Sequence, residues 1–331
     1  MNIYLNNGYC DIESIIKAGL PFNFIVGGRG TGKTYGALKY LLESGKEFIL
    51  LRRTQTQVDI IGKPEFSPFK ALERDLGIEV TCKSLTKYTS GFYVNEKLIG
   101  IVCALSTFSN LRGFSSTAEI LVFDEFIPER HERPIKEEGG AFLNVIETVN
   151  RNRELNGFNP IQVLCLANAN DIGNSIFMEL DLIKHAEKLK QSKRLYYMNK
   201  ERGLLLVNLE ESPISKKKEE TALYKLIKNS QFKKMSLSND YIDDSIAVIK
   251  SENLDSYNPL VTISDCTIYK HKSEKRYYMS EHRKGSPEIY STASADIERF
   301  RKKFYYLWGA YLGRKLIFEN KLCSVIFEKL W

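Results

Sequence analysis

Short apolar runs recur along the chain up to about residue 210, each bounded by polar or glycine-containing segments. Continuous apolar stretches of this length are typical of parallel strands that are buried on both faces. Between them, residues 35–42 and 141–149 have apolar side chains at helical spacing. The pattern therefore predicts an α/β fold around a parallel sheet. Its predicted strands are 22–26, 48–53, 120–125, 161–167 and 203–209.

The pattern changes after Ser212-Pro213, which breaks the last of these strands. Residues 216–235 are lysine-rich with helical spacing, and strand patterns return from about residue 258. Two runs, 260–269 and 276–280, flank a polar turn and predict a β-hairpin. We therefore predict a main α/β domain over 1–211, a helical linker over 212–250 and a small α+β domain over 251–331.

Charge is distributed unevenly along the chain. Residues 1–183 carry a net charge of −3 and residues 184–331 one of +10. A basic half indicates a polyanionic partner such as nucleic acid, although a solvated lysine-rich surface has the same composition. Residues 299–308 mix basic and aromatic side chains, which suits stacking on nucleic-acid bases and equally suits an amphipathic helix with its aromatic face in a core.

Composition excludes several other classes of protein. The chain has 331 residues, of which 43% are hydrophobic, so it can build two cores. No run approaches the roughly 18 apolar residues of a membrane span, and the N-terminal residues lack a signal-peptide pattern. The cysteines and histidines are scattered without ligand spacing, which predicts free thiols and no structural zinc site.

The octapeptide at 27–34 fits the phosphate-binding pattern G-x-x-x-x-G-K-[ST]. Glycines let backbone N–H groups turn toward phosphate oxygens, and the loop lies between a predicted strand and a predicted helix, as this role requires. We expect Lys33 to reach the β- and γ-phosphates of ATP and Thr34 to hold Mg²⁺. The predicted nucleotide-binding residues are Gly27, Gly28, Arg29, Gly30, Thr31, Gly32, Lys33 and Thr34.

The apolar run 120–123 ends in two carboxylates, Asp124 and Glu125. Ligands of open α/β sheets bind beyond the carboxyl ends of the strands, so both side chains are expected beside the phosphates. Asp124 is the candidate for holding Mg²⁺ through its water shell. Glu125 is the candidate catalytic base that orients the water attacking the γ-phosphate.

The run 161–167 ends at Asn168, whose amide is placed to hydrogen-bond the attacking water or a γ-phosphate oxygen. Asparagine is also an ordinary turn residue at a strand end, and both interpretations stay open. A further strand, 48–53, lies in sequence between the two nucleotide-binding motifs. Together with Glu125, it is the pattern of the additional-strand, catalytic-glutamate class of P-loop ATPases, which includes RecA-like motors.

Several segments resemble the ATPase domain of phage genome-packaging motors, and most closely that of phi-29-like podophages. The resemblance implies ATP hydrolysis that drives double-stranded DNA through a portal into an empty prohead, by a homo-oligomeric, pentameric ring. It also implies a place in the host cytoplasm and transiently at the portal vertex, not in the mature virion, with a packaging RNA as a further partner. It covers residues 20–210 and rests on the loop 27–34, Leu105-Ser106, Leu111-Arg112-Gly113, Asp124-Glu125-Phe126, 150–153 and 166–169.

In such a ring, a neighbouring subunit can insert an arginine that neutralises charge on the γ-phosphate. Arg151 and Arg153, which follow the predicted helix 141–149, are the positions we expect, with Arg112 and Arg130 as weaker candidates. Arg151 and Arg153 are alternatively surface residues paired with nearby glutamates. The segment 54–64, flanked by Arg53 and carrying Lys63, is either a DNA-contacting pore loop or an ordinary surface connection.

Larger motors of this kind carry a ribonuclease-H-like nuclease after the ATPase domain, and Asp265 lies where a first metal ligand is expected. Two-metal cleavage needs several converging carboxylates, and the acids from Glu281 onward form no recognisable set. We therefore predict a degenerate nuclease fold used for binding. The alternative functions are a helicase or recombinase-type ATPase and a nucleotide-regulated nucleic-acid-binding scaffold.

Overall fold

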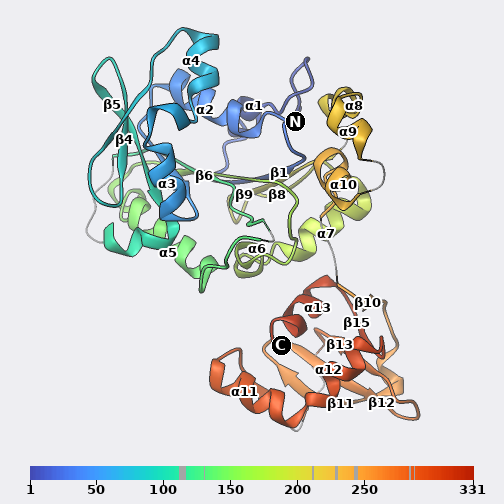
Figure 1. Cartoon of the computed structure of the whole chain (residues 1–331). Helices are drawn as coiled ribbons and strands as arrows, with labels where there is room; N and C mark the ends of the chain where they lie inside the picture. The colour runs from blue at the N-terminus through green and yellow to red at the C-terminus, as the bar shows by residue number, and fades with distance from the viewer. Residues whose placement is uncertain are drawn as a thin grey trace. The chain divides into compact units, whose positions relative to one another are not determined.

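The computed structural model describes residues 1–111, 117–129, 131–210, 212–227, 230–241, 245–282, 285–286 and 288–331 (Figure 1). The chain forms two compact units. Unit 1 comprises Met1–Leu180 and Lys188–Ile242, and unit 2 comprises Asp181–Glu187 and Asp243–Trp331. No helix of the described residues is long and apolar enough to span a membrane.

Unit 1 is built on a sheet whose described strands run in the order β3-β4-β5-β2-β6-β7-β1-β9-β8. The strands from β5 to β9 in this order are parallel, and antiparallel strands complete both edges. The sequence prediction of an α/β fold with a large parallel sheet is confirmed. The strands are β1 (Phe22–Gly27), β2 (Phe48–Arg52), β3 (Thr81–Ser84), β4 (Ser90–Val94), β5 (Lys97–Ala104), β6 (Ile120–Asp124), β7 (Gln162–Ala167), β8 (Tyr196–Asn199) and β9 (Leu204–Leu209).

One strand, β7, separates the two strands that carry the nucleotide-binding motifs. It pairs with β1 on one side and β6 on the other, so the loop after β1 and the carboxylates after β6 lie two strand positions apart. In the sheet, the strand inserted between the two motif-carrying strands is therefore β7. The predicted strand 48–53 corresponds to β2, which lies between the motifs in sequence but pairs with the other side of β6.

Side chains that alternate along the central strands supply two separate cores. Ile25, Leu50 and Leu164 pack with helices on one face of the sheet, and Phe24 and Phe123 point to the opposite face. Figure 1 shows α1 and α2 on one side of this sheet and α5 and α6 on the other. The helices are α1 (Ile12–Ile16), α2 (Lys33–Ser44), α3 (Gln55–Ile61), α4 (Lys70–Leu76), α5 (Glu138–Asn150) and α6 (Ser175–Glu179), followed by α7 (Ile183–Ser192).

The segment 54–64 is not the predicted loop. Most of it forms helix α3, which starts with a capping box in which the Thr54 hydroxyl accepts from the backbone of Gln57 and the Gln57 side chain accepts from the Thr54 backbone. The prediction that Arg53 contacts DNA is also wrong, because the Arg53 side chain is fully buried. Its Nε donates to Glu138 at 2.7 Å and its Nη1 to Glu132 at 3.1 Å.

The division into parts differs from the predicted one. Residues 212–250 are not a separate helical linker, because their three helices belong to unit 1 and two of them lie close to the loop that follows β1. These helices are α8 (Pro213–Glu219), α9 (Ala222–Leu226) and α10 (Gln231–Ser238). Asn239, which ends α10, donates a hydrogen bond to the Val26 carbonyl at 3.2 Å. The basic segment is thus part of the same unit as the nucleotide-binding motifs.

Unit 2 contains a second sheet, with described strands in the order β10-β15-β13-β12-β11-β14. The predicted first arm of the hairpin, 260–269, is wrong, because a turn at Ser264 and Asp265 splits it into two antiparallel strands. The elements are β10 (Val248–Ile249), β11 (Tyr257–Ile263), β12 (Cys266–His271), β13 (Tyr277–Ser280), β14 (Ile289–Tyr290), β15 (Leu316–Phe318), α11 (Ser294–Lys303), α12 (Tyr305–Leu312) and α13 (Lys321–Glu328).

The aromatic side chains of 299–308 divide between a core and the surface. Phe300 and Phe304 are buried in the core of unit 2 and stack with ring centroids 5.3 Å apart. Tyr305 is 71% exposed. The amphipathic-helix interpretation therefore accounts for the phenylalanines, and Tyr305 is left available at the surface.

The buried ion pair between Arg53 and Glu138 generates a test of stability. Arg53→Met leaves the Glu138 carboxylate buried without its cation, which should destabilise the protein by about 3–5 kcal/mol. The double variant Arg53→Met/Glu138→Leu removes both charges and should recover part of this loss. Thermal unfolding of both is compared with Lys39→Ala, which breaks an exposed pair with Glu43 and should change little. A midpoint for Arg53→Met equal to that of Lys39→Ala would contradict the assignment.

Candidate nucleotide-binding site

The loop between β1 and α2 has the backbone that its glycines allow. Gly30 has φ 68° and Gly32 has φ 85°, a region that other residues rarely adopt. At Gly28, a Cβ would lie 2.2 Å from the carbonyl oxygen of Ser236 in α10. The loop is thus held by its own turns and by close approach of a helix from the basic segment.

Lys33 is the most deeply buried cation of this loop. Its Nζ donates to the carbonyls of Gly27 and Gly28, both at 2.9 Å, and lies 3.3 Å from the Asn168 side-chain oxygen. Burial lowers the pKa of Lys33 to about 8, and the nearby cations Lys218 and Arg29 act in the same direction. Neutral oxygens rather than carboxylates hold this ammonium, so it can bind an incoming anion.

The two predicted halves of the site meet at Thr34 and Asp124. The Thr34 hydroxyl donates to Asp124 Oδ1 at 3.0 Å, although ninety positions separate the two residues in the chain. A hydroxyl and a carboxylate at this distance beside a phosphate-binding loop are the oxygen donors that Mg²⁺ uses in such sites. The donor chemistry therefore fits Mg²⁺.

Arg52, the last residue of β2, binds both carboxylates at the end of β6, Asp124 and Glu125. Its Nη1 donates to Asp124 Oδ2 at 2.7 Å, and its Nη2 donates to Glu125. Only 14% of the Arg52 side chain is exposed. Sequence reasoning missed this residue, and the one available signal was its place at the end of a predicted strand.

Glu125 occupies a backbone conformation that is unusual for glutamate, with φ 58°. Its side chain is 52% exposed, so it reaches the open part of the site. Partial burial raises the pKa of Glu125, Arg52 opposes that shift and the neighbouring Asp124 carboxylate adds to it. The carboxylate is thus held by one guanidinium at the mouth of the cavity.

These side chains line one cavity of about 310 Å³. It brings together residues from the loop after β1, the start of α2 and the ends of β6 and β7, as the sequence motifs predicted. Its lining residues are Arg29, Gly30, Thr31, Gly32, Lys33, Thr34, Tyr35, Asp124, Glu125, Leu166, Ala167 and Asn168.

The arginines predicted to act in trans lie elsewhere. Arg151 and Arg153 follow α5 and line a different cavity from Lys33. Arg153 donates to the carbonyls of Asn159 and Ala118, whereas Arg151 is exposed and donates to Thr148 of its own helix. Arg112 and Arg130 lie outside the described residues.

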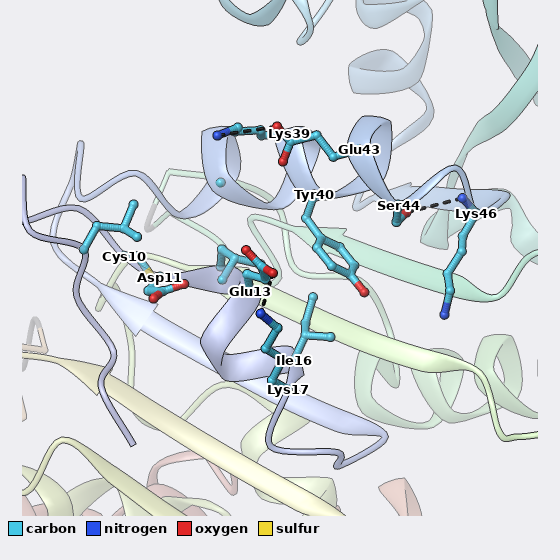
Figure 2. A pocket seen from close by; sticks show the side chains of 13 residues that line it. Cys10, Asp11, Glu13, Ile16, Lys17, Lys39, Tyr40, Glu43, Ser44 and Lys46 are labelled. Atoms are coloured by element: carbon cyan, nitrogen blue, oxygen red, sulfur yellow. Dashed lines mark hydrogen bonds and ion pairs between the residues drawn. The ribbon is translucent and has the colours of Figure 1, made fainter.

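A second groove lies between α1 and α2, the helix that directly follows the phosphate-binding loop (Figure 2). Its cavity is larger, about 470 Å³. The lysines there pair with carboxylates, Lys17 with Glu13, Lys39 with Glu43 and Lys46 with Glu119. These cations are already balanced, so the groove lacks the unneutralised charge of the site around Lys33.

Within the described part of unit 2, the acids do not form the carboxylate set of a two-metal nuclease. Asp265 is exposed in a turn and not on a strand. Glu281, Glu288 and Asp296 each pair with a cation, namely Lys184, Lys303 and Arg299. Among the described residues, one possible ligand group was missed by sequence spacing: Glu281, Glu319 and Cys323, with ligand atoms within 4.8 Å of one another.

The pKa of Lys33 generates a pH-dependence test. Phosphate binds the ammonium form, and a lysine with a pKa of about 8 loses that form as the pH rises through this value. The affinity for ATP should therefore fall from about pH 7 to about pH 9, with proton uptake on binding at the higher pH. Calorimetric titration in buffers of different ionisation enthalpy measures both effects. Lys33→Arg, which stays charged, should lose this dependence, and a wild-type affinity that stays constant over this range would contradict the assignment.

Comparison with known proteins gives a consistent family. A family model described as "Podovirus DNA encapsidation protein (Gp16)" matches residues 8–300. The DNA packaging protein of Bacillus phage phi29 is 29% identical over 240 residues, which are 71% of this chain and 66% of that protein, just under two thirds of its length. The DNA packaging protein of Bacillus phage B103 is 25% identical over 323 residues, 92% of this chain and 94% of that protein.

Solved structures share the fold. The bacteriophage Phi-29 viral genome packaging motor assembly contains a chain with a TM-score of 0.69 and 19% identity, covering 100% of both chains. The Phi-28 gp11 DNA packaging motor gives a TM-score of 0.63 at 19% identity, covering 98% of this chain and 97% of that one. With the family match extending over most of its length, the chain belongs to the family of podovirus DNA encapsidation proteins (Gp16).

Proposed function

We propose that this protein hydrolyses ATP and uses the energy to move double-stranded DNA into a prohead through the portal. The observation that carries the proposal is the 3.0 Å hydrogen bond between Thr34 and Asp124, which joins the phosphate-binding loop to a carboxylate strand end beside Lys33. Membership of a DNA encapsidation family supports the choice of DNA as the transported molecule and of the prohead as its destination.

The polar side chains of the sequence motifs each have a role in this proposal. Lys33 binds the β- and γ-phosphates, with the backbone N–H groups of residues 28–34 around it. Thr34 and Asp124 hold Mg²⁺, which neutralises phosphate charge when bound. Asn168 positions the Lys33 ammonium through its side-chain oxygen, and its amide N–H₂ is the group that would hydrogen-bond a γ-phosphate oxygen or the attacking water.

Glu125 accepts a hydrogen bond from the attacking water and orients it toward the γ-phosphate. Its carboxylate is bonded to Arg52, which keeps it ionised and fixes its direction. Because Arg52 also binds Asp124, a change at the metal-binding carboxylate is transmitted directly to the base. Arg52 is a positioning residue in this scheme.

The fold, the motif spacing and the inserted strand β7 support assignment of unit 1 to the RecA-like, additional-strand, catalytic-glutamate ATPases. We assign unit 2 to binding, as a degenerate ribonuclease-H-like domain that contacts nucleic acid or the portal. A homo-oligomeric, pentameric ring, a packaging RNA and a transient place at the portal vertex in the host cytoplasm belong to the same proposal. The Phi-29 structure, described as a motor assembly, supports a multi-subunit arrangement.

The role of Glu125 as the catalytic base in ATP hydrolysis can be tested with the purified protein. ATPase activity should rise on addition of double-stranded DNA, and Glu125→Gln should lower the stimulated rate by about a hundredfold or more while ATP binding persists. Lys33→Ala should lose binding as well. Glu119→Gln, at the opposite end of β6, is the matched control and should retain the wild-type rate. Wild-type activity in Glu125→Gln excludes this base, and a rate indifferent to DNA favours the scaffold function.

Arg151 and Arg153 can be tested for action in trans. If a neighbouring subunit supplies the arginine, mixing an Arg151→Ala protein with a Lys33→Ala protein should restore part of the ATPase activity, because some interfaces then combine an intact loop with an intact arginine. Arg153→Ala should show mainly lower thermal stability, because Arg153 is bonded to backbone carbonyls of its own chain. Failure of both arginine variants to complement rules out the trans arrangement at these positions.

A further inference from the structure

A lysine from the basic segment lies against the phosphate-binding loop. The Nζ of Lys218, on α8, donates a hydrogen bond to the carbonyl oxygen of Arg29. The same Nζ lies 2.8 Å from the position that a Cβ on Gly30 would occupy. Although 189 positions separate Lys218 from Arg29 in sequence, its ammonium lies at the middle of the loop.

The charge of Lys218 is not neutralised by a carboxylate within the described part of the chain. Its partners are the Arg29 carbonyl and the ring of Tyr224, whose centroid is 5.4 Å from Nζ. Neutral partners of this kind leave the positive charge uncompensated. Lys218 is half-buried, so water compensates it only in part.

Arg29 is bound differently. Its guanidinium pairs with Glu129 and lies over the ring of Phe232 in α10, with its carbon 5.6 Å from the ring centroid. Its charge is therefore already balanced. Lys33 and Lys218 remain as two ammonium groups held only by neutral groups, and each repels the other's charge.

We propose that Lys218 is a second phosphate-binding lysine, which contributes its ammonium to the nucleotide triphosphate from outside the phosphate-binding motif. Two uncompensated cations next to one cavity form an anion site, and a polyphosphate has the charge to satisfy both. The inference rests on the proposed use of ATP and adds a residue that the motif does not contain.

This role would connect nucleotide binding to the helices α8–α10. The helix α10 approaches Gly28 through Ser236, and the residue that ends it, Asn239, donates a hydrogen bond to the carbonyl of Val26 in β1. A phosphate that attracts Lys218 therefore acts on a helical layer that already contacts both the loop and the strand before it.

Equilibrium binding of a fluorescent ATP analogue to the full chain tests the proposal, with tripolyphosphate as a competitor that lacks the base and ribose. Lys218→Gln keeps a donor for the Arg29 carbonyl but loses the charge. It should lower the affinity of the protein for both ligands about tenfold. Lys217→Gln, an exposed lysine of the same helix, is the matched control and should bind as the wild type does. Lys218→Arg, which keeps the charge, should lose less affinity than Lys218→Gln.

Thermal unfolding without nucleotide separates binding from folding. Lys218→Gln should unfold near the wild-type temperature and gain less stability from added ATP. Equal affinities of Lys218→Gln and wild type for both ligands overturn the inference while the proposed ATPase function stands. Failure of the wild type itself to bind the ATP analogue overturns both. Equal losses in Lys218→Gln and Lys217→Gln also overturn it, because a general loss of positive charge then explains the effect.

Discussion

Hydrogen bonding between the parallel strands β1, β7, β6 and β2 fixes the positions of all the groups at the site. Val26 lies opposite Ala167 and Leu166 opposite Asp124, so these strands end at one edge of the sheet in register. The loop that carries Lys33, the two carboxylates and Asn168 therefore emerge together. The cavity lies beyond the carboxyl ends of these strands, where open α/β sheets bind their ligands.

The sequence predicted this part of the site well, because each signal was local. The glycine pattern, the apolar run before Asp124 and the asparagine after 161–167 each lie within a few residues of the strand that positions them. Arg52 and Lys218 carry no such signal. Their importance depends on which remote residues the fold brings within reach, and neither the spacing nor the composition of the chain contains that information.

Errors in the predicted fold have similarly physical causes. The segment 54–64 contains no long apolar stripe, and its helix depends on a capping box and on Val58 and Ile61 packing against the sheet core. The run 260–269 is apolar and β-prone on both sides of Ser264, so hydrophobicity alone does not show the turn. The lysine-rich composition of 212–250 suggested a helical linker, but Tyr224, Met235 and Leu237 are buried.

Arg52 and Arg53 are consecutive residues whose side chains lie on opposite sides of the sheet at the end of β2. The first binds the carboxylates of the cavity, and the second is buried against Glu138. Because strand side chains alternate, deleting or inserting one residue in 48–52 would turn each arginine toward the opposite face of the sheet. We therefore expect β2 to diversify among related proteins by substitution at constant length, since one codon gained or lost would break the contacts of Arg52 with Asp124 and Glu125 and the buried ion pair of Arg53 together.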